Sequence, residues 1–306
     1  MVPFLSVPNV LDAVVVRGAL ASALATPDLV IEIPHGATRT VDFTSVEALL
    51  RSPLPDALID FFYVNTDAGA PELAEAIARR FVTQHPARSV AVLRCRIPRT
   101  FIDCNRVIDA DPAAFREGKV TPGLMPWITD PDDRALLQER YARYAAAARA
   151  AAEATEAVGG AMLMLHTYAP RSVDVEVDKD IVRNLRRAYE PAVFDTWPLR
   201  PELDVIGRGT DGTPFAPAVV VDRLRSNLAA VGLHAADSET YPMHPSTMAW
   251  HLAQKLPGRA LCLEVRRDLL AAPFTPFAEM TISPDKAGRI AAPLADALGA
   301  WWPAVE

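Results

Sequence analysis

The chain alternates short apolar runs with longer stretches in which apolar and polar positions recur with a helical period. A polar or turn residue closely follows each run, as is typical of buried central strands in an α/β sheet. The predicted strands cover Leu29–Ile33, Leu58–Val64, Val90–Arg94, Ala161–Leu165 and Ala260–Val265.

Helical patterns fill the intervals between these runs. Pro71–Gln84 begins with a proline and repeats apolar residues at i, i+3 and i+4, and proline is favoured in the first turn of a helix. Asp133–Val158 is rich in alanine and stops at Gly159-Gly160, a common signal for a helix end. Strands alternating with helices, without a Gly/Ser linker or a fixed repeat, predict one three-layer α/β/α domain over residues 1–306. The other predicted helices cover Val219–Val231, His244–Leu256 and Asp285–Trp301.

The composition limits the classes of partner. Lys and Arg number 31 against 38 Asp and Glu, a formal net charge of −7, whereas a nucleic-acid-binding surface is basic. The N-terminal stretch MVPFLSVPNVLDAVVVRGAL lacks the basic start of a signal peptide, and no apolar run is long enough for a membrane span. The three cysteines have no CxxC spacing, which fits a reducing compartment. We therefore expect a cytoplasmic protein with neither nucleic-acid nor membrane partners.

Chemically capable side chains follow three of the predicted strands. His35 comes just after the strand that ends at Ile33, His166 follows the strand 161–165, and Glu264 lies at the end of LCLEV. A lone histidine in a loop is more often a solvated side chain than a site residue. In α/β sheets, however, functional sites form beyond the carboxyl ends of the strands. Three chemically capable residues at three strand ends are more than random placement along the chain would usually give.

A zinc hydrolase needs residue types that this chain offers. Two histidines and one carboxylate hold a catalytic zinc and leave a position for water, and a second carboxylate must accept the proton of that water. Asp67 follows the predicted strand 58–64 and offers a carboxylate, although its alternative role is a helix N-cap. The segment Arg99–Arg106 brings two arginines and an amide that can grip a substrate carboxylate. Its alternative is a weak surface ion pair between Arg106 and Asp103 or Asp109.

Five motifs, in order along residues 31 to 270, resemble those of the N-formylglutamate amidohydrolase family. The last two are similar to that family's second histidine segment and its acidic strand end. The motifs are Pro34-His35-Gly36, Thr66-Asp67-Ala68-Gly69-Ala70, Pro98-Arg99-Thr100-Phe101-Ile102-Asp103-Cys104-Asn105-Arg106, Leu165-His166-Thr167-Tyr168-Ala169-Pro170 and Leu263-Glu264-Val265-Arg266-Arg267-Asp268-Leu269-Leu270.

The resemblance implies a zinc-dependent amidohydrolase with a central mixed sheet, similar to the zinc carboxypeptidases and other zinc-dependent exopeptidases. Its substrate would be a small N-formyl or other N-acyl amino acid. It implies Zn²⁺ ligands, a general base, a group that polarises the scissile carbonyl or assists anion binding, and a clamp on the substrate carboxylate. By this resemblance the zinc ligands would be His35, Asp67 and His166, and the general base would be Glu264. Arg99 would polarise the carbonyl or assist anion binding, and Asn105 with Arg106 would form the clamp. Apart from the resemblance, Tyr241 and Arg266 are further candidate substrate-binding residues, and the alternative for Tyr241 is a tyrosine that only packs.

The chain departs from the family pattern at several positions. Gly36-Ala37 stands where the family usually has serine, and Met164 replaces an aspartate two residues before the second histidine. A ligating histidine normally donates its other N–H to an acceptor, so a backbone carbonyl or another side chain must replace that aspartate. The segment Glu239–Pro245 replaces the family's Asn-x-Pro-Tyr. Two alternatives therefore stay open: a carboxypeptidase-like hydrolase of a short peptide or other amide, and a non-catalytic carboxylate-binding protein.

Overall fold

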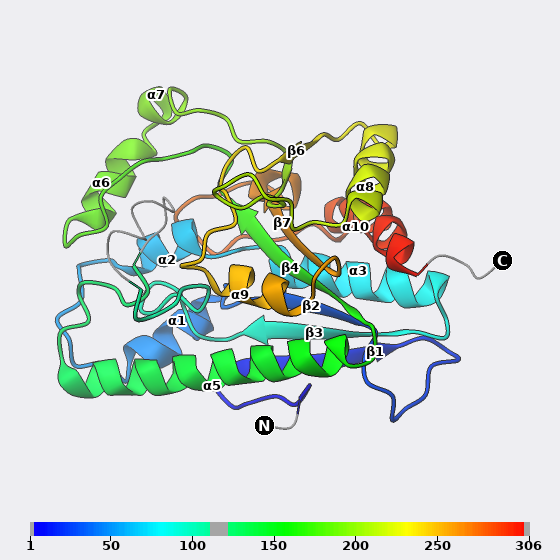
Figure 1. Cartoon of the computed structure of the whole chain (residues 1–306). Helices are drawn as coiled ribbons and strands as arrows, with labels where there is room; N and C mark the ends of the chain where they lie inside the picture. Colours follow the sequence, from blue (N-terminus) through cyan, green and yellow to red (C-terminus); the bar gives the residue numbers. More distant parts are fainter. Residues whose placement is uncertain (1–2, 111–121, 303–306) are drawn as a thin grey trace.

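A seven-stranded mixed sheet forms the centre of the computed structural model, which describes residues 3–110 and 122–302 (Figure 1). The strand order is β1-β3-β2-β4-β7-β5-β6. The four central strands, β3, β2, β4 and β7, run parallel, whereas β1 pairs antiparallel with β3 and β5 pairs antiparallel with β7. The strands are β1 Leu11–Arg17, β2 Leu29–Ile33, β3 Ser89–Cys95, β4 Ala161–Tyr168, β5 Leu203–Val205, β6 Ala235–Asp237 and β7 Ala260–Arg266.

Helices cover both faces of the sheet and complete the predicted three layers. The long helix α5 lies along one face, and α3, α8 and α10 pack together on the other (Figure 1). The helices are α1 Thr40–Glu47, α2 Ile59–Asn65, α3 Ala70–Gln84, α5 Pro131–Glu156, α6 Ile181–Ala188, α7 Pro191–Phe194, α8 Ala218–Ala230, α9 Met248–Lys255 and α10 Pro284–Leu298, with short 3-10 turns at Arg267–Leu269 and Gly299–Trp301. Within the described ranges, no helix combines the length and hydropathy that a membrane crossing requires.

The alternation of side chains along β2 shows how the sheet divides the core. Leu29, Ile31 and Ile33 join the apolar cluster under α3 and α10, while Val30 joins the cluster on the α5 side. Glu32 is buried on that side and accepts a hydrogen bond from the Tyr144 hydroxyl of α5. Burial raises the pKa of Glu32, because desolvation penalises its charged form.

The prediction of a strand over Leu58–Val64 is wrong, because Ile59–Asn65 forms helix α2 with Leu58 as its N-cap residue. Leu58, Phe61 and Phe62 are buried, and their i, i+3, i+4 spacing places them on one helix face. A short apolar run fits both the two-residue period of a strand and the 3.6-residue period of a helix, and here tertiary packing selects the helix.

Three strands have no counterpart among the predictions: β1, β5 and β6. β5 and β6 have three residues each, too few to display a period. The predicted helix His244–Leu256 begins later, at Met248, where the Thr247 hydroxyl accepts a hydrogen bond from the backbone N–H of Trp250.

Candidate functional site

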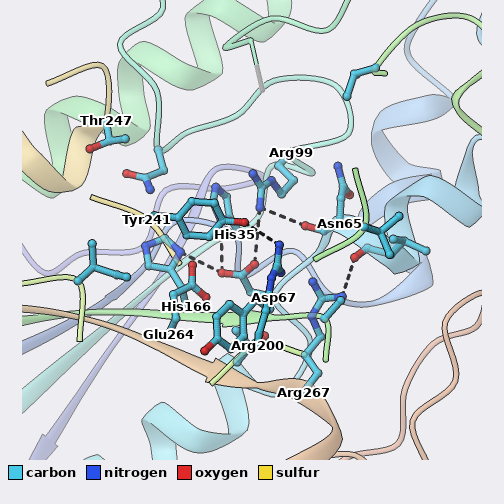
Figure 2. Close-up of a pocket in the computed structure, with 18 of the residues that line it drawn as sticks. His35, Asn65, Asp67, Arg99, His166, Arg200, Tyr241, Thr247, Glu264 and Arg267 are labelled. Atoms are coloured by element: carbon cyan, nitrogen blue, oxygen red, sulfur yellow. Dashed lines mark hydrogen bonds and ion pairs between the residues drawn. The ribbon is translucent and has the colours of Figure 1, made fainter. Parts of the chain in front are cut away.

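Parallel pairing brings the ends of β2, β3, β4 and β7 to one edge of the sheet, and the site lies there. His35 follows β2 by two residues. His166 of β4 lies directly beside Glu264 of β7 in the strand register. Their side chains line one pocket (Figure 2), as the rule for open α/β sheets predicts.

Asp67 reaches this edge from the turn between α2 and α3. Gly69 precedes α3 with φ of 91°, a left-handed conformation that glycine adopts readily. The backbone carbonyl of Asp67 accepts the Ala70 N–H, and α3 has no side-chain cap. The Asp67 carboxylate is therefore not an N-cap and points instead to the two histidines.

His35, Asp67 and His166 form a buried group whose ligand atoms all lie within 4.8 Å of one another. Oδ2 of Asp67 lies 3.3 Å from Nδ1 of His35 and 3.0 Å from Nδ1 of His166. Burial alone would raise the pKa of Asp67, but the charge of His35 and the hydrogen bonds of both histidines outweigh it and hold that pKa well below its usual range. Two imidazole nitrogens and one carboxylate oxygen suit zinc, so the donor set fits this metal.

Asp103 orients His35 from behind. Its Oδ1 lies 2.7 Å from Nε2 of His35 and also accepts the Asn105 N–H at 2.9 Å. A carboxylate on the far nitrogen of a ligating histidine fixes the ring and raises its basicity. Burial alone would raise the pKa of Asp103, but the charges of Arg106 and Arg99 hold it well below its usual range.

His166 has a different neighbour on its far side. Nε2 of His166 is buried and has no conventional hydrogen-bond partner in the described residues, and the nearby polar group is the thiol of Cys262, which interacts with His166. Cys262 pairs in register with Met164, two residues before the His166–Glu264 pair. Met164 itself is fully buried in the core. The adjacent strand thus brings a thiol close to His166, for which Met164 provides no acceptor.

Glu264 presents a carboxylate oxygen to the pocket without a protein partner. Oε2 is buried and makes no hydrogen bond within the described residues. Burial raises the pKa of Glu264, because a desolvated carboxylate favours its neutral form. The neighbouring Arg266 bonds Asp268 instead, so Glu264 is not held by an ion pair with it.

Arg99, Asn105 and Arg106 line the same pocket. Arg99 donates to Asp103 at 2.8 Å, and its Nη1 lies 3.8 Å from Asp67 Oδ1. Arg106 and Asp103 form a pair at 3.4 Å in which both side chains are buried, not the surface pair considered from the sequence. Asn105 accepts the Ala249 N–H through its side-chain oxygen, which leaves its NH₂ group as the donor for a ligand.

The two further substrate-binding predictions have different outcomes. Tyr241 lines the pocket, and its hydroxyl accepts a hydrogen bond of 2.8 Å from Arg200. Arg266 does not lie among the pocket-lining residues, because its guanidinium bonds Asp268 and the Arg200 carbonyl. The adjacent Arg267 lines the pocket in its place.

Sequence reasoning missed Arg200 and Arg267. Arg200 stacks over the rings of Tyr168 and Tyr241. Arg267 is buried, donates to the Val64 carbonyl at 2.6 Å, and has an Nε without a hydrogen-bond partner in the described chain. Arg267 stood beside the predicted Arg266 in the sequence, whereas Arg200 gave no signal because it lies in a loop far from any motif.

The pocket is a cavity of about 260 Å³. Its floor holds His35, Asp67, His166 and Glu264, and Arg99 lies beside them (Figure 2). Apolar residues of α2, α6 and the segment after β4 line another wall. A group that could hold a metal ion, a carboxylate oxygen without a hydrogen-bond partner in the described residues, and several cations surround one cavity. These are the parts that hydrolysis of an anionic amide requires.

Comparisons with known proteins identify the family and the fold. Residues 28–271 match the family model of N-formylglutamate amidohydrolase, which confirms the resemblance carried by the motifs. Among solved structures, N-formylglutamate amidohydrolase from Ralstonia eutropha JMP134 is 19% identical with a TM-score of 0.56, over 95% of this chain and 98% of that chain. The gene product Atu2144 from Agrobacterium tumefaciens is 16% identical with a TM-score of 0.54, over 94% and 93%. No curated protein matches the chain. At these identities the two structures establish the shared fold.

Proposed function

Because the chain belongs to the N-formylglutamate amidohydrolase family, we propose that it uses zinc to hydrolyse the amide bond of an N-formyl or other N-acyl amino acid. Family membership places it among amide-cleaving hydrolases. The observation that supports the metal is the convergence of His35, Asp67 and His166 beside the buried Glu264. These three residues would hold the zinc, which when bound acts as a Lewis acid and lowers the pKa of water.

Glu264 is the general base in this proposal. Glu264 lines the cavity, and its Oε2 makes no hydrogen bond to any residue that the structure describes, so it can accept the proton of the attacking water. A raised pKa brings a carboxylate closer to the range where it can both take and return a proton. Glu264 then gives that proton to the departing amine, which completes the cleavage.

Asn105 and Arg106 would hold the substrate carboxylate, and Arg99 would polarise the scissile carbonyl. Asp103 connects these groups, because it contacts His35, Arg99 and Arg106. One buried carboxylate therefore fixes the positions of a metal ligand and of two substrate-binding cations. Such fixed donors make the attack effectively unimolecular and stabilise developing negative charge without reorganisation.

Metal analysis of the purified protein, combined with a substrate screen, tests this function. We expect one zinc per chain, and hydrolysis of N-formyl or N-acetyl amino acids that a chelator removes and added zinc restores. Cleavage of short peptides alone would favour the carboxypeptidase-like alternative. Binding of these acids without turnover in the zinc-loaded protein would favour a carboxylate-binding protein and overturn the proposal.

A further inference from the structure

The pocket has an apolar wall that the proposed chemistry does not use. After β4 the chain runs Val173-Asp174-Val175-Glu176-Val177, and all three valines line the pocket, whereas Asp174 and Glu176 are exposed. This alternation is that of an extended segment with one face turned inward. Three valines exposed only to water would gain no burial energy, whereas three valines that line a cavity can contact a bound apolar group.

Helices α2 and α6 extend the same wall. Phe61 of α2 and Ile181 and Leu185 of α6 also line the pocket and are almost fully buried. An ion pair of 2.7 Å between Arg186 and Asp60 links the two helices. We call the region lined by Phe61, Val173, Val175, Val177, Ile181 and Leu185 the apolar chamber.

The apolar chamber lies in the same cavity as the metal-ligand cluster, so a group in the chamber belongs to the molecule whose amide is cleaved. The three valines are only half-buried, and covering such a surface with an apolar group is favourable. A buried methylene is worth roughly a fourfold gain in affinity. An acidic group placed against the chamber would lose its hydration, because none of the six side chains that line the chamber offers a hydrogen-bond donor in return.

We infer that the apolar chamber binds an aliphatic or aromatic group of the substrate, so that this chain prefers apolar N-acyl amino acids to acidic ones. This inference rests on the proposed function and specifies its substrate class. The apolar group is either the amino-acid side chain or the acyl chain, and both present the same chemistry to the valines.

Rates of hydrolysis on a matched set of substrates show whether the amino-acid side chain or the acyl chain occupies the chamber. We expect kcat/KM for N-formylleucine, or for N-hexanoylglycine if the acyl chain occupies the chamber, to exceed that for N-formylglycine by at least about 10-fold. N-formylglutamate should be no better than N-formylglycine. Equal rates on all four compounds, or a preference for N-formylglutamate, would overturn the inference while leaving the proposed function intact.

Binding provides a measurement that does not depend on turnover. Leucine or hexanoate should raise the melting temperature of the protein more than glutamate does at equal concentration. If no N-acyl amino acid is hydrolysed, the proposed function fails. The order of the melting-temperature increases still shows whether the chamber prefers apolar ligands to acidic ones. Stronger protection by glutamate would refute it.

A pair of variants in the same segment locates the effect. Val175→Asp places a charge in the chamber and should lower the ratio of kcat/KM for the preferred apolar substrate to that for N-formylglycine by at least about 10-fold. Asp174→Asn alters the adjacent outward side chain and should leave the ratio unchanged. An unchanged ratio in Val175→Asp, with the protein folded, would show that the substrate does not reach the chamber.

Discussion

The substitution Glu264→Gln separates a catalytic carboxylate from a structural one. The amide has nearly the same shape but cannot accept a proton from water. A structural Glu264 would instead form an ion pair with one of the arginines that follow it, Arg266 or Arg267. The structure pairs Arg266 with Asp268 and bonds Arg267 Nη1 to the Val64 carbonyl, so the substitution removes no direct ion pair with either arginine.

The expected magnitudes follow from these contacts. Loss of a general base costs on the order of 10²–10⁴ in rate, which is about 2.7–5.4 kcal/mol of transition-state stabilisation. Oε2 of Glu264 has no hydrogen-bond partner in the described residues, and burial raises its pKa. Replacing this desolvated acid with a neutral amide should therefore change the free energy of unfolding by less than about 1 kcal/mol, or the melting temperature by less than about 4 °C.

Turnover, zinc content and melting temperature should be measured on one preparation of Glu264→Gln. We expect turnover to fall within the stated range while zinc content and melting temperature are retained. Glu176→Gln makes the same chemical change at an exposed position and should retain full activity. Undiminished turnover would refute the assignment as base. Loss of zinc together with loss of stability would make Glu264 a structural residue or a ligand.

Three further predictions test the rest of the site and the fold. His35→Ala should abolish stoichiometric zinc, measured by elemental analysis, while the exposed-site control His251→Ala retains it; full zinc in His35→Ala would contradict the ligand assignment. Arg106→Lys keeps a charge near Asp103 but loses the planar guanidinium fork. The value of kcat/KM should therefore fall at least about 10-fold on N-acyl amino acids and barely change on the matching carboxamides. Equal losses on both would indicate that Arg106 has a structural role. Asp133 accepts hydrogen bonds from Arg51 and Ser52. Burial would raise the pKa of Asp133, but these hydrogen bonds outweigh burial and lower that pKa. The Asp133 carboxylate therefore stabilises the fold above its unfolded-state pKa, and this contribution is lost as the pH falls through the lower pKa of the folded state. Asp133→Asn should therefore cost roughly 1–3 kcal/mol of unfolding free energy at pH 7 and progressively less in acid, measured by urea denaturation, and a pH-independent difference would refute the argument.

The sequence by itself determined where the chemistry gathers. His35, His166 and Glu264 each come at the end of a buried apolar run, and parallel strands necessarily bring such ends to one edge. The period of the pattern and the chemistry of the side chains were sufficient to expect them at one edge, and the parallel pairing of β2, β4 and β7 in the structure brings them there. The motif order added Asp67, Arg99, Asn105 and Arg106, all of which the structure brings to the same pocket.

Only the tertiary structure decided features that depend on partners distant in sequence. The run 58–64 became helix α2 because packing, not the short pattern, sets its period. Arg267 and not Arg266 lines the pocket, since the end of β7 turns into a 3-10 helix that reverses the alternation. Asp103 contacts His35 from the loop after β3, and Cys262 of β7 interacts with His166 of β4. The path of that loop and the register of those strands come only from the assembled fold.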